Sequence, residues 1–213
     1  MLTVWGRATS SNVQKAMWAV GELGLPHQRI DAGGAYGGLD TPEFAAMNPH
    51  RRIPTIDDGG LIVWESNAIV RYLSLRYGTG TLYPDDWARR AAADQWMDWM
   101  LSTLYRDWID LFWGLVRTAP SKRDPAAIAA KAVRTGEHLQ ILDAHLAKQP
   151  YVGGETLTMG DIPIGSTLYR YFDMEIERPS LPNVEAYYAR LRARPAYAAH
   201  VMVSYESLRV ADG

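Results

Sequence analysis

Two patterns of hydrophobic and polar positions divide the chain. Over the first 77 residues short apolar runs typical of strands alternate with amphipathic segments, whereas almost everything after Asp86 repeats its apolar residues at helical spacing. Residues 78–86 hold two glycines and a proline without any periodicity, a composition typical of a linker. We therefore predict an α/β domain over residues 1–77, a linker over 78–86 and an all-helical domain over 87–213.

The elements expected in the first domain follow the order βαβ, a short helix and then ββα. Strands are expected at residues 2–5, 27–31, 55–57 and 61–64. Helices are expected at residues 13–23, 42–47 and 66–77. The tight turn Asp58-Gly59-Gly60 joins the last two strands, which should therefore be antiparallel within a mixed sheet. Thr41 is placed to cap the short helix.

The second domain should consist of about five helices. They are expected at residues 87–117, 124–148, 158–171, 183–192 and 196–208. The third begins with Thr158-Met159-Gly160-Asp161, a Thr-x-x-Asp pattern. In such a cap the hydroxyl and the carboxylate each satisfy a backbone donor at the start of the helix. We interpret this motif as structural.

Composition limits the partners and the chemistry. With 47% hydrophobic residues the chain can bury a sizeable core, and a formal net charge of -2 leaves no broad basic surface for nucleic acid or an anionic membrane. No run approaches the about 18 apolar residues of a membrane span, so we expect a cytoplasmic protein. The five histidines lack the spacing of a zinc site, and no metal is expected. Because the chain has no cysteine, any thiol chemistry must use a thiol that a ligand brings.

Pro54 interrupts a pattern that otherwise predicts a strand. Proline removes a backbone donor from a sheet, and the start of a strand tolerates it best when the preceding bond is cis. Ile53 would then offer its backbone N–H and C=O to an extended ligand in strand-like pairing. The alternative is an ordinary proline at the edge of a sheet.

Glu65 and Ser66 stand where a strand ends and a helix begins. A helix N-terminus gathers free N–H groups and suits a carboxylate, while the neighbouring Glu65 can hold an ammonium group. The pair therefore predicts a receptor for the head group of an amino acid. The alternative is a serine that caps the helix beside an exposed glutamate.

Together these motifs resemble the cytosolic glutathione transferase family, and within it bacterial theta-like or nu-like members of the serine or asparagine type. The resemblance extends over essentially the whole chain, because the order and spacing of the motifs match as well as the motifs themselves. It implies a thioredoxin-like N-terminal domain, an all-helical C-terminal domain and a homodimer. The matched elements are Asn48-Pro49, Arg52-Ile53-Pro54-Thr55, Glu65-Ser66-Asn67-Ala68-Ile69, Tyr72-Leu73 and Thr158-Met159-Gly160-Asp161.

The resemblance also implies how glutathione, the co-substrate, is held. Ile53 would pair with the cysteinyl backbone of glutathione just before a cis-Pro54. Glu65 and Ser66 would hold the γ-glutamyl end, and Arg52 would lie near the glycyl carboxylate. The neighbouring Arg51 would point the other way along an extended segment, toward solvent.

The family places the residue that activates the thiol between the first strand and the first helix, here residues 7–12. Hydrogen bonds and a helix N-terminus lower the pKa of a thiol, and a serine hydroxyl acts as a donor rather than a base. Ser10 resembles the catalytic serine of theta-like members, and Asn12 resembles the asparagine of nu-like, disulfide-reducing members. We favour Ser10 as the donor, Asn12 as a second polar contact and Ser11 as the fallback. At least one of the three should also cap the helix.

The helix expected at 87–117 is rich in aromatic residues, most of which should pack in the core or in a dimer interface. By resemblance, Tyr105, Arg106 and Trp113 are candidates for the wall of an electrophile pocket beside the thiol.

The sequence thus favours a glutathione transferase with a role in detoxification, in which the thiolate of glutathione attacks a small, apolar electrophile. Two alternatives stay open at this point. One is glutathione-dependent reduction of disulfides or peroxides, which Asn12 keeps open. The other is a non-catalytic binding protein that keeps the fold and the glutathione site without turnover.

Overall fold

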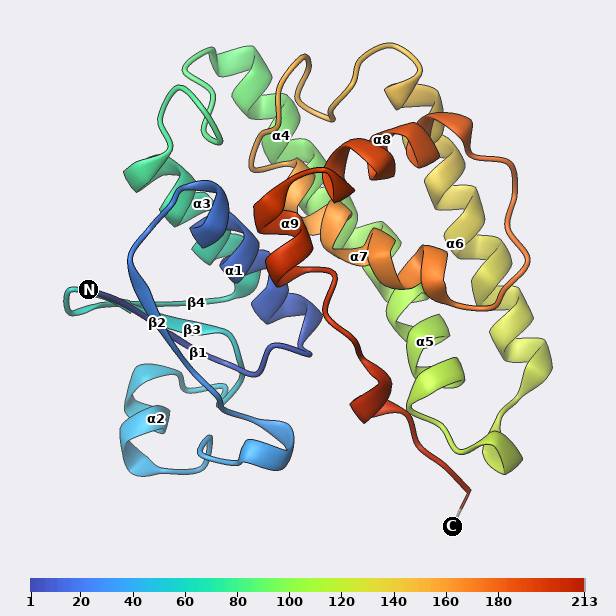
Figure 1. Cartoon of the computed structure of the whole chain (residues 1–213), viewed down its shortest axis with the longest axis horizontal. Helices are drawn as coiled ribbons and strands as arrows, with labels where there is room; N and C mark the ends of the chain where they lie inside the picture. Colours follow the sequence, from blue (N-terminus) through green and yellow to red (C-terminus); the bar gives the residue numbers. More distant parts are fainter. Residues whose placement is uncertain (213) are drawn as a thin grey trace.

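The computed structural model describes residues 1–212 and contains a four-stranded mixed sheet in its N-terminal half (Figure 1). The strands are β1 (Leu2–Trp5), β2 (His27–Ile30), β3 (Thr55–Asp58) and β4 (Leu61–Trp64). Across the sheet their order is β2-β1-β3-β4. Strand β1 is parallel to β2 and antiparallel to β3, and β3 is antiparallel to β4. The predicted βαβ and ββ units are confirmed, and each strand lies within one residue of its expected bounds.

Three helices accompany the sheet. They are α1 (Ser11–Glu22), α2 (Pro42–Met47) and α3 (Ser66–Tyr77). Helices α1 and α3 pack against each other and bury Val13, Ile56 and Ile69 in a common core. The predicted cap of α2 is present, since the Thr41 hydroxyl accepts a hydrogen bond from the Phe44 N–H at 3.2 Å.

The C-terminal half is helical, as predicted, and lies beside the sheet in Figure 1. Its helices are α4 (Trp87–Trp99), α5 (Tyr105–Val116), α6 (Pro125–Leu146), α7 (Asp161–Asp173), α8 (Pro182–Arg192) and α9 (Pro195–His200). A π-helical turn, Met100–Leu104, joins α4 to α5 within the segment that was expected to be one helix. Such turns are often found at functional sites. This one directly precedes Tyr105.

The last predicted helix, 196–208, is wrong in its second half. Helix α9 ends at His200, and only a short 3₁₀ turn, Glu206–Leu208, follows it. A tertiary contact competes with a longer helix over these residues. The buried Tyr205 donates a hydrogen bond from its hydroxyl to Asp173 Oδ2 at 2.6 Å. The β-branched Val201 and Val203 also disfavour continuation of the helix.

The predicted cap at 158–161 is formed mainly by its carboxylate. Asp161 Oδ2 accepts hydrogen bonds from the Thr158 N–H at 2.7 Å and from the Thr158 hydroxyl at 3.0 Å. Its Oδ1 accepts from the Val152 N–H and from the Tyr187 hydroxyl, both at 2.9 Å. No backbone N–H within residues 1–212 donates to the Thr158 hydroxyl, so the hydroxyl does not cap a backbone donor. Helix α7 therefore begins at Asp161, three residues later than predicted.

One continuous core joins the two halves. Trp18 of α1 is fully buried and packs edge-on against Tyr197 of α9, with ring centres 4.8 Å apart. At the start of α1, Arg170 Nη2 of α7 donates a hydrogen bond to the Thr9 carbonyl at 2.7 Å. The first turn of α1 is therefore held at the border between the sheet and the helical half. Among the described residues, no helix combines the length and the apolar character that a membrane crossing needs.

Candidate active site

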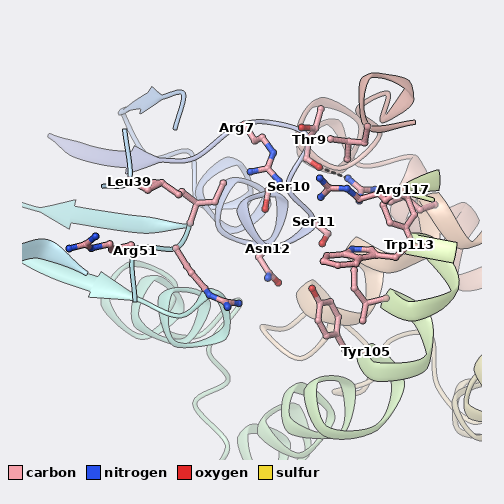
Figure 2. A pocket seen from close by; sticks show the side chains of 16 residues that line it. Arg7, Thr9, Ser10, Ser11, Asn12, Leu39, Arg51, Tyr105, Trp113 and Arg117 are labelled. Carbon is pink, nitrogen blue, oxygen red and sulfur yellow. Dashed lines mark hydrogen bonds between the residues drawn. The ribbon is translucent and has the colours of Figure 1, made fainter. Parts of the chain in front are cut away.

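A cavity of about 330 Å³ opens at this border (Figure 2). Segments far apart in the sequence line it: the loop and first turn at the start of α1, the residues just before β3, and one face of α5. Leu39, Arg170 and Leu208 complete the lining. In Figure 2, Ser10, Ser11 and Asn12 follow the start of α1, and Tyr105 and Trp113 face them from α5. The cavity thus brings the three candidate thiol-activating residues together with two of the three candidates for the pocket wall.

Ser10 is held at the N-terminus of α1 by local structure. An added Cβ on Gly6 would lie 2.4 Å from Val13 Cγ2, so the turn out of β1 has room only for glycine. Ser10 is the N-cap of the helix, and its Oγ accepts a hydrogen bond from the Val13 N–H at 3.4 Å. Because the oxygen accepts this bond through a lone pair, the hydroxyl hydrogen remains free to be donated to another group. Capping the helix and donating to a thiolate are therefore compatible roles for Ser10.

Asn12 links α1 to α3. Its Oδ1 accepts a hydrogen bond from the Ser66 hydroxyl at 3.3 Å, which leaves the Asn12 Nδ2 amide available as a donor. Ser66 in turn accepts a bond from Lys15 Nζ at 3.5 Å. A series of hydrogen bonds thus connects Asn12 in the cavity wall, through Ser66 at the start of α3, to the buried Lys15.

Lys15 is the site residue that the sequence analysis missed. Its side chain is fully buried, its Nζ also donates to Asn67 Oδ1 at 3.5 Å, and it lies 5.2 Å from the centre of the Tyr105 ring. Burial lowers the pKa of Lys15 to about 7, while the charge of Glu65 opposes that shift. The sequence carries no clear signal for this position, because Lys15 directly follows Gln14 and a lysine in an amphipathic helix ordinarily lies on the solvent face.

The segment before β3 has the predicted backbone conformation. The peptide bond between Ile53 and Pro54 is cis. Asn48 is buried and anchors the segment, since its Nδ2 donates to the Arg52 carbonyl at 2.9 Å and to Thr55 Oγ1 at 3.0 Å. Neither the backbone N–H nor the C=O of Ile53 has a hydrogen-bond partner within residues 1–212. Both groups are therefore available to an extended ligand.

Two residues hold unusual backbone conformations beside this segment. Glu65, with φ of 70°, and Arg51, with φ of 50°, are the two non-glycine residues with positive φ in the described part of the chain. Such conformations cost about 1–3 kcal/mol each and cluster at functional sites. Glu65 itself occupies the N-cap position of α3 and is exposed, so the alternative in which Ser66 serves as the cap is wrong. The Glu65 carboxylate projects freely next to the buried Ser66.

The sequence matches the family model described as glutathione S-transferase, N-terminal domain, over residues 1–74, and that described as glutathione S-transferase, C-terminal domain, over residues 125–190. Glutathione S-transferase GstB of Escherichia coli (strain K12) is 42% identical over 205 residues, which cover 95% of this chain and 99% of the relative. The chain belongs to the glutathione S-transferase family.

Solved structures of other family members agree with this assignment. The theta class glutathione S-transferase from Xanthomonas axonopodis pv. citri, with glutathione bound, is 53% identical and gives a TM-score of 0.91, covering 95% of this chain and 98% of that one. The Bombyx mori glutathione transferase BmGSTD1 is 28% identical and gives a TM-score of 0.87, covering 97% and 95%. The predicted glutathione transferase fold is thereby confirmed, with its thioredoxin-like domain and its helical domain.

The three candidates for the electrophile pocket differ in which cavity they line. Tyr105 and Trp113 line the cavity, and Trp113 is 54% exposed. Burial raises the pKa of the Tyr105 phenol, and the neighbouring Ser11 and Asn12 side chains oppose that rise. Arg106 does not line this cavity but a second one between α5 and α6, which Tyr105 and Ile109 also border.

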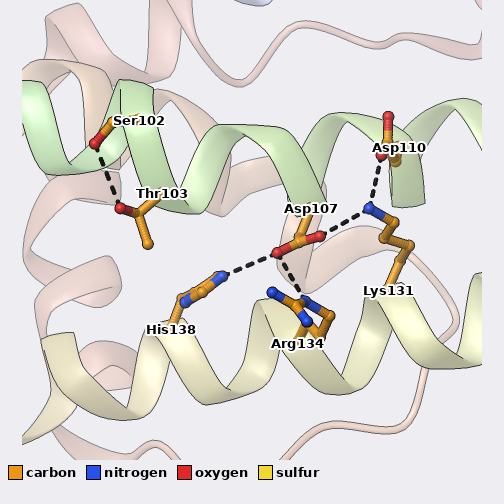
Figure 3. Close-up of polar contacts among 7 residues, drawn as sticks. All are labelled: Ser102, Thr103, Asp107, Asp110, Lys131, Arg134 and His138. Carbon is orange, nitrogen blue, oxygen red and sulfur yellow. Dashed lines mark hydrogen bonds and ion pairs between the residues drawn. The ribbon is translucent and has the colours of Figure 1, made fainter.

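The second cavity is built around a buried carboxylate (Figure 3). Asp107 of α5 accepts hydrogen bonds from Lys131 at 2.8 Å, Arg134 at 3.3 Å and His138 at 3.0 Å, all from α6. Burial opposes ionisation, yet these donors together lower the pKa of Asp107 to about 2. Because the charges in this cluster compensate one another, we assign it the structural role of fastening α5 to α6.

Arg52 and Ile53 line the first cavity, whereas Pro54, Glu65 and Ser66 lie next to it in the adjoining segments. Within residues 1–212 no group of three or more histidine, aspartate or glutamate side chains is arranged to hold a metal ion.

Proposed function

We propose that this chain is a glutathione transferase that holds the thiol of glutathione as a thiolate and directs it to the electrophilic atom of a small second substrate. The observation that carries the proposal is a single cavity in which the donors at the start of α1 face the segment with the cis bond before Pro54, beside aromatic residues of α5. Membership of the family supports the same conclusion.

The binding step uses groups that the protein leaves free. In the proposed complex the cysteinyl backbone of glutathione pairs with the N–H and C=O of Ile53, and Arg52 takes the glycyl carboxylate. The exposed Glu65 receives the γ-glutamyl ammonium. The γ-glutamyl carboxylate lies at the N-terminus of α3 beside Ser66, where the helix dipole favours an anion.

The chemical step depends on the charge of the sulfur. A free thiol of this type has a pKa near 8.5, so the neutral form predominates at neutral pH. The Ser10 hydroxyl donates a hydrogen bond to the thiolate, the N-terminus of α1 adds its dipole, and Asn12 Nδ2 supplies a second donor. The thiol proton passes to solvent, sulfur forms a bond to the electrophilic atom, and the leaving group departs with its electron pair.

The proposal is tested with glutathione and the purified protein. We expect calorimetric binding of glutathione, thiolate absorbance at neutral pH in the complex, and conjugation of 1-chloro-2,4-dinitrobenzene above the uncatalysed rate. Binding without thiolate formation and without turnover of a panel of electrophiles would instead support a non-catalytic binding protein.

A second candidate activity is glutathione-dependent reduction of disulfides or peroxides. The position of Asn12 in the cavity wall, with its amide free to donate, favours this activity. All sulfur would come from glutathione, because the protein has no cysteine. Turnover of 2-hydroxyethyl disulfide or cumene hydroperoxide, faster than that of any electrophile tested, would identify it as the main activity.

Replacing Ser10 by alanine should raise the pKa of bound glutathione by about 1–2 units, since a hydrogen bond to a charged group contributes about 1.5–3 kcal/mol. At pH 7 we expect kcat/KM to fall about 10- to 100-fold. Titration of thiolate absorbance measures the pKa, and steady-state conjugation measures the rate.

The controls for this variant separate catalysis from capping. Asp86 is the N-cap of α4, and its carboxylate accepts a hydrogen bond from the Arg89 N–H at 2.8 Å. The variant Asp86→Ala therefore also removes an N-cap, but it should leave the pKa of bound glutathione unchanged. Ser11→Ala and Asn12→Ala test the other two candidates. An unchanged titration in Ser10→Ala with a raised pKa in either of these would move the donor role away from Ser10.

We further propose that the protein acts in the cytoplasm as a homodimer with glutathione and a small electrophile as its substrates. Large apolar side chains such as Leu75, Leu101 and Ile141 are exposed on the single chain, which supports burial against a second copy. Light scattering coupled to gel filtration should give twice the mass of the chain, and a monomer at micromolar concentration would contradict the proposal.

A further inference from the structure

The cavity is lined by five arginines and, within the described residues, by no aspartate or glutamate. Two of the five are otherwise accounted for: Arg52 is proposed to hold the glycyl carboxylate, and Arg51 forms an ion pair with Asp40 at 3.5 Å. The other three are Arg7, Arg117 and Arg170. None of these three forms an ion pair with any of residues 1–212.

The three guanidinium groups are held by contacts that leave their charge uncompensated. Arg170 is 2% exposed, donates from Nη2 to the Thr9 carbonyl and lies over the Phe112 ring at 4.6 Å, but its buried Nε has no partner among residues 1–212. Arg117 stacks over the Trp113 ring at 5.4 Å. Arg7 lies against the backbone of Gly34, where an added Cβ would be 3.4 Å from the guanidinium carbon.

Burial and the repulsion between neighbouring positive charges both disfavour the charged forms of Arg7 and Arg170. Burial and the charge of Arg117 both lower the pKa of Arg7, and burial lowers the pKa of Arg170 to about 10, with Arg7 contributing in the same direction. Nearby tyrosines Tyr105, Tyr169 and Tyr205 act in the opposite direction on Arg170. Like charges gathered at a partly buried site lack a counter-charge, and a bound anion would supply one.

Arg117 lies away from the part of the cavity assigned to glutathione, whereas Arg7 meets Leu39 and Ile53 around Gly33. In Figure 2, Arg117 and Trp113 lie on the far side of Ser10 and Asn12 from Arg51. The same region carries the apolar side chains of Ile109, Phe112 and Trp113. It therefore offers an apolar wall next to a cationic edge, on the side where the second substrate must approach the sulfur.

We propose that the electrophile used by this site carries a carboxylate, which binds among Arg7, Arg117 and Arg170 while its apolar body lies against the aromatic residues of α5. This inference rests on the proposed glutathione transferase function and names its substrate class. It revises the small, apolar electrophile favoured in the sequence analysis, which took no account of the arginines.

A matched pair of substrates tests the proposal: 4-chloro-3-nitrobenzoate and 4-chloro-3-nitrobenzamide, which have similar size and differ in charge. In both, the thiolate forms a C–S bond at the ring carbon that carries chlorine, and chloride leaves with the electrons of the C–Cl bond. With each kcat/KM divided by its uncatalysed rate, we expect the benzoate to be preferred at least about tenfold, as charged hydrogen bonds of this kind allow. Added salt should reduce this preference.

The variant Arg117→Ala should reduce the ratio of benzoate to benzamide turnover by about tenfold. Arg106→Ala is the matched control, since it removes the same charge from α5 at an exposed position outside the cavity, and it should leave the ratio unchanged. The ratio also separates substrate recognition from thiolate stabilisation, because a less stable thiolate slows both reactions equally. Equal losses for the two substrates in Arg117→Ala would therefore overturn the proposal.

A binding measurement decides the proposal independently of turnover, so a failure of carboxylate recognition is distinguished from a failure of the transferase function. Calorimetry with S-methylglutathione present compares unreactive 3-nitrobenzoate with 3-nitrobenzamide. Tighter binding of the anion in the wild type, lost in Arg117→Ala and kept in Arg106→Ala, supports recognition of a carboxylate. Equal affinity for the two ligands overturns it.

Discussion

An Asp161→Ala variant should lose about 4 kcal/mol of its free energy of unfolding. The Asp161 side chain is fully buried and accepts hydrogen bonds from the N–H groups of Val152 and Thr158 and from the hydroxyls of Thr158 and Tyr187. Burial raises the pKa of this carboxyl group, and the four donors oppose that rise. Alanine leaves buried donors without a partner, at about 1–3 kcal/mol each.

Urea unfolding followed by circular dichroism measures the loss, and the melting temperature should fall by about 10 °C for a chain of this size. Asp124→Ala is the control. Asp124 is exposed and caps α6 through one hydrogen bond from the Ala127 N–H at 3.0 Å, so its loss should cost only about 1 kcal/mol. Similar losses in the two variants would mean that the buried network around Asp161 contributes no more than an ordinary cap.

The parts of the site that could be predicted from the sequence are those whose chemistry is local. Pro54 breaks an apolar run, which indicated either a cis bond with a free backbone at Ile53 or an ordinary edge proline, and the neighbouring Glu65-Ser66 motif favoured the first. Glu65 and Ser66 stand at a join between strand and helix, where the position itself implies unpaired N–H groups. Ser10 follows the same logic, because an N-cap is specified by its own side chain and the next three residues.

The parts that could not be predicted depend on contacts between distant segments. Lys15 and Ser66 are 51 residues apart, and no period along α1 says that a lysine there meets the start of α3. Arg7, Arg117 and Arg170 reach one cavity from three different elements. Hydrophobic periodicity shows which face of a helix is buried. It does not show which charged groups of other segments contact that face.

One predicted pocket residue, Arg106, lies outside the first cavity. Arg106 is exposed and lines the second cavity, whereas its neighbour Tyr105 borders both cavities. Helical periodicity does not predict this outcome, because Arg106 and Trp113 are seven positions apart and share one face of a regular helix. The π-helical turn just before Tyr105 adds to the difficulty, because an extra residue in one turn changes the faces presented by everything after it.

The second large effect concerns Lys15, whose replacement by methionine should make stability depend less on pH. Lys15 is buried, and no carboxylate of residues 1–212 lies within ion-pair distance of it. Burial lowers its pKa to about 7, and the negative charge of Glu65 opposes this shift. In the unfolded chain it keeps the ordinary value of 10.5. Between these values the unfolded chain binds one more proton than the folded chain, so the free energy of unfolding rises with pH by up to about 1.4 kcal/mol per unit.

Methionine fills similar space and binds no proton, so this slope should be absent in Lys15→Met. The stability of the variant relative to the wild type should therefore fall by about 2 kcal/mol between pH 7 and pH 9, measured by urea unfolding at both values. The lost contacts to Ser66 and Asn67 change the variant equally at both pH values and do not affect this difference. The exposed Lys148, replaced by methionine, should show no such change. Parallel curves for Lys15→Met and the wild type would contradict a lowered pKa for Lys15.

The same lysine connects stability to the proposed function. A γ-glutamyl carboxylate beside Ser66 would lie near Lys15 Nζ, which is 3.5 Å from Ser66 Oγ, and would raise the pKa of the buried amine. Binding near pH 8 should then take up a proton. S-methylglutathione has no thiol to ionise, and calorimetry in two buffers of different ionisation enthalpy counts the protons. The proton uptake of the ligand's own amine is common to the wild type and the variant, so the difference between the two isolates Lys15. We expect greater proton uptake in the wild type than in Lys15→Met; equal proton counts would place the γ-glutamyl end away from Ser66.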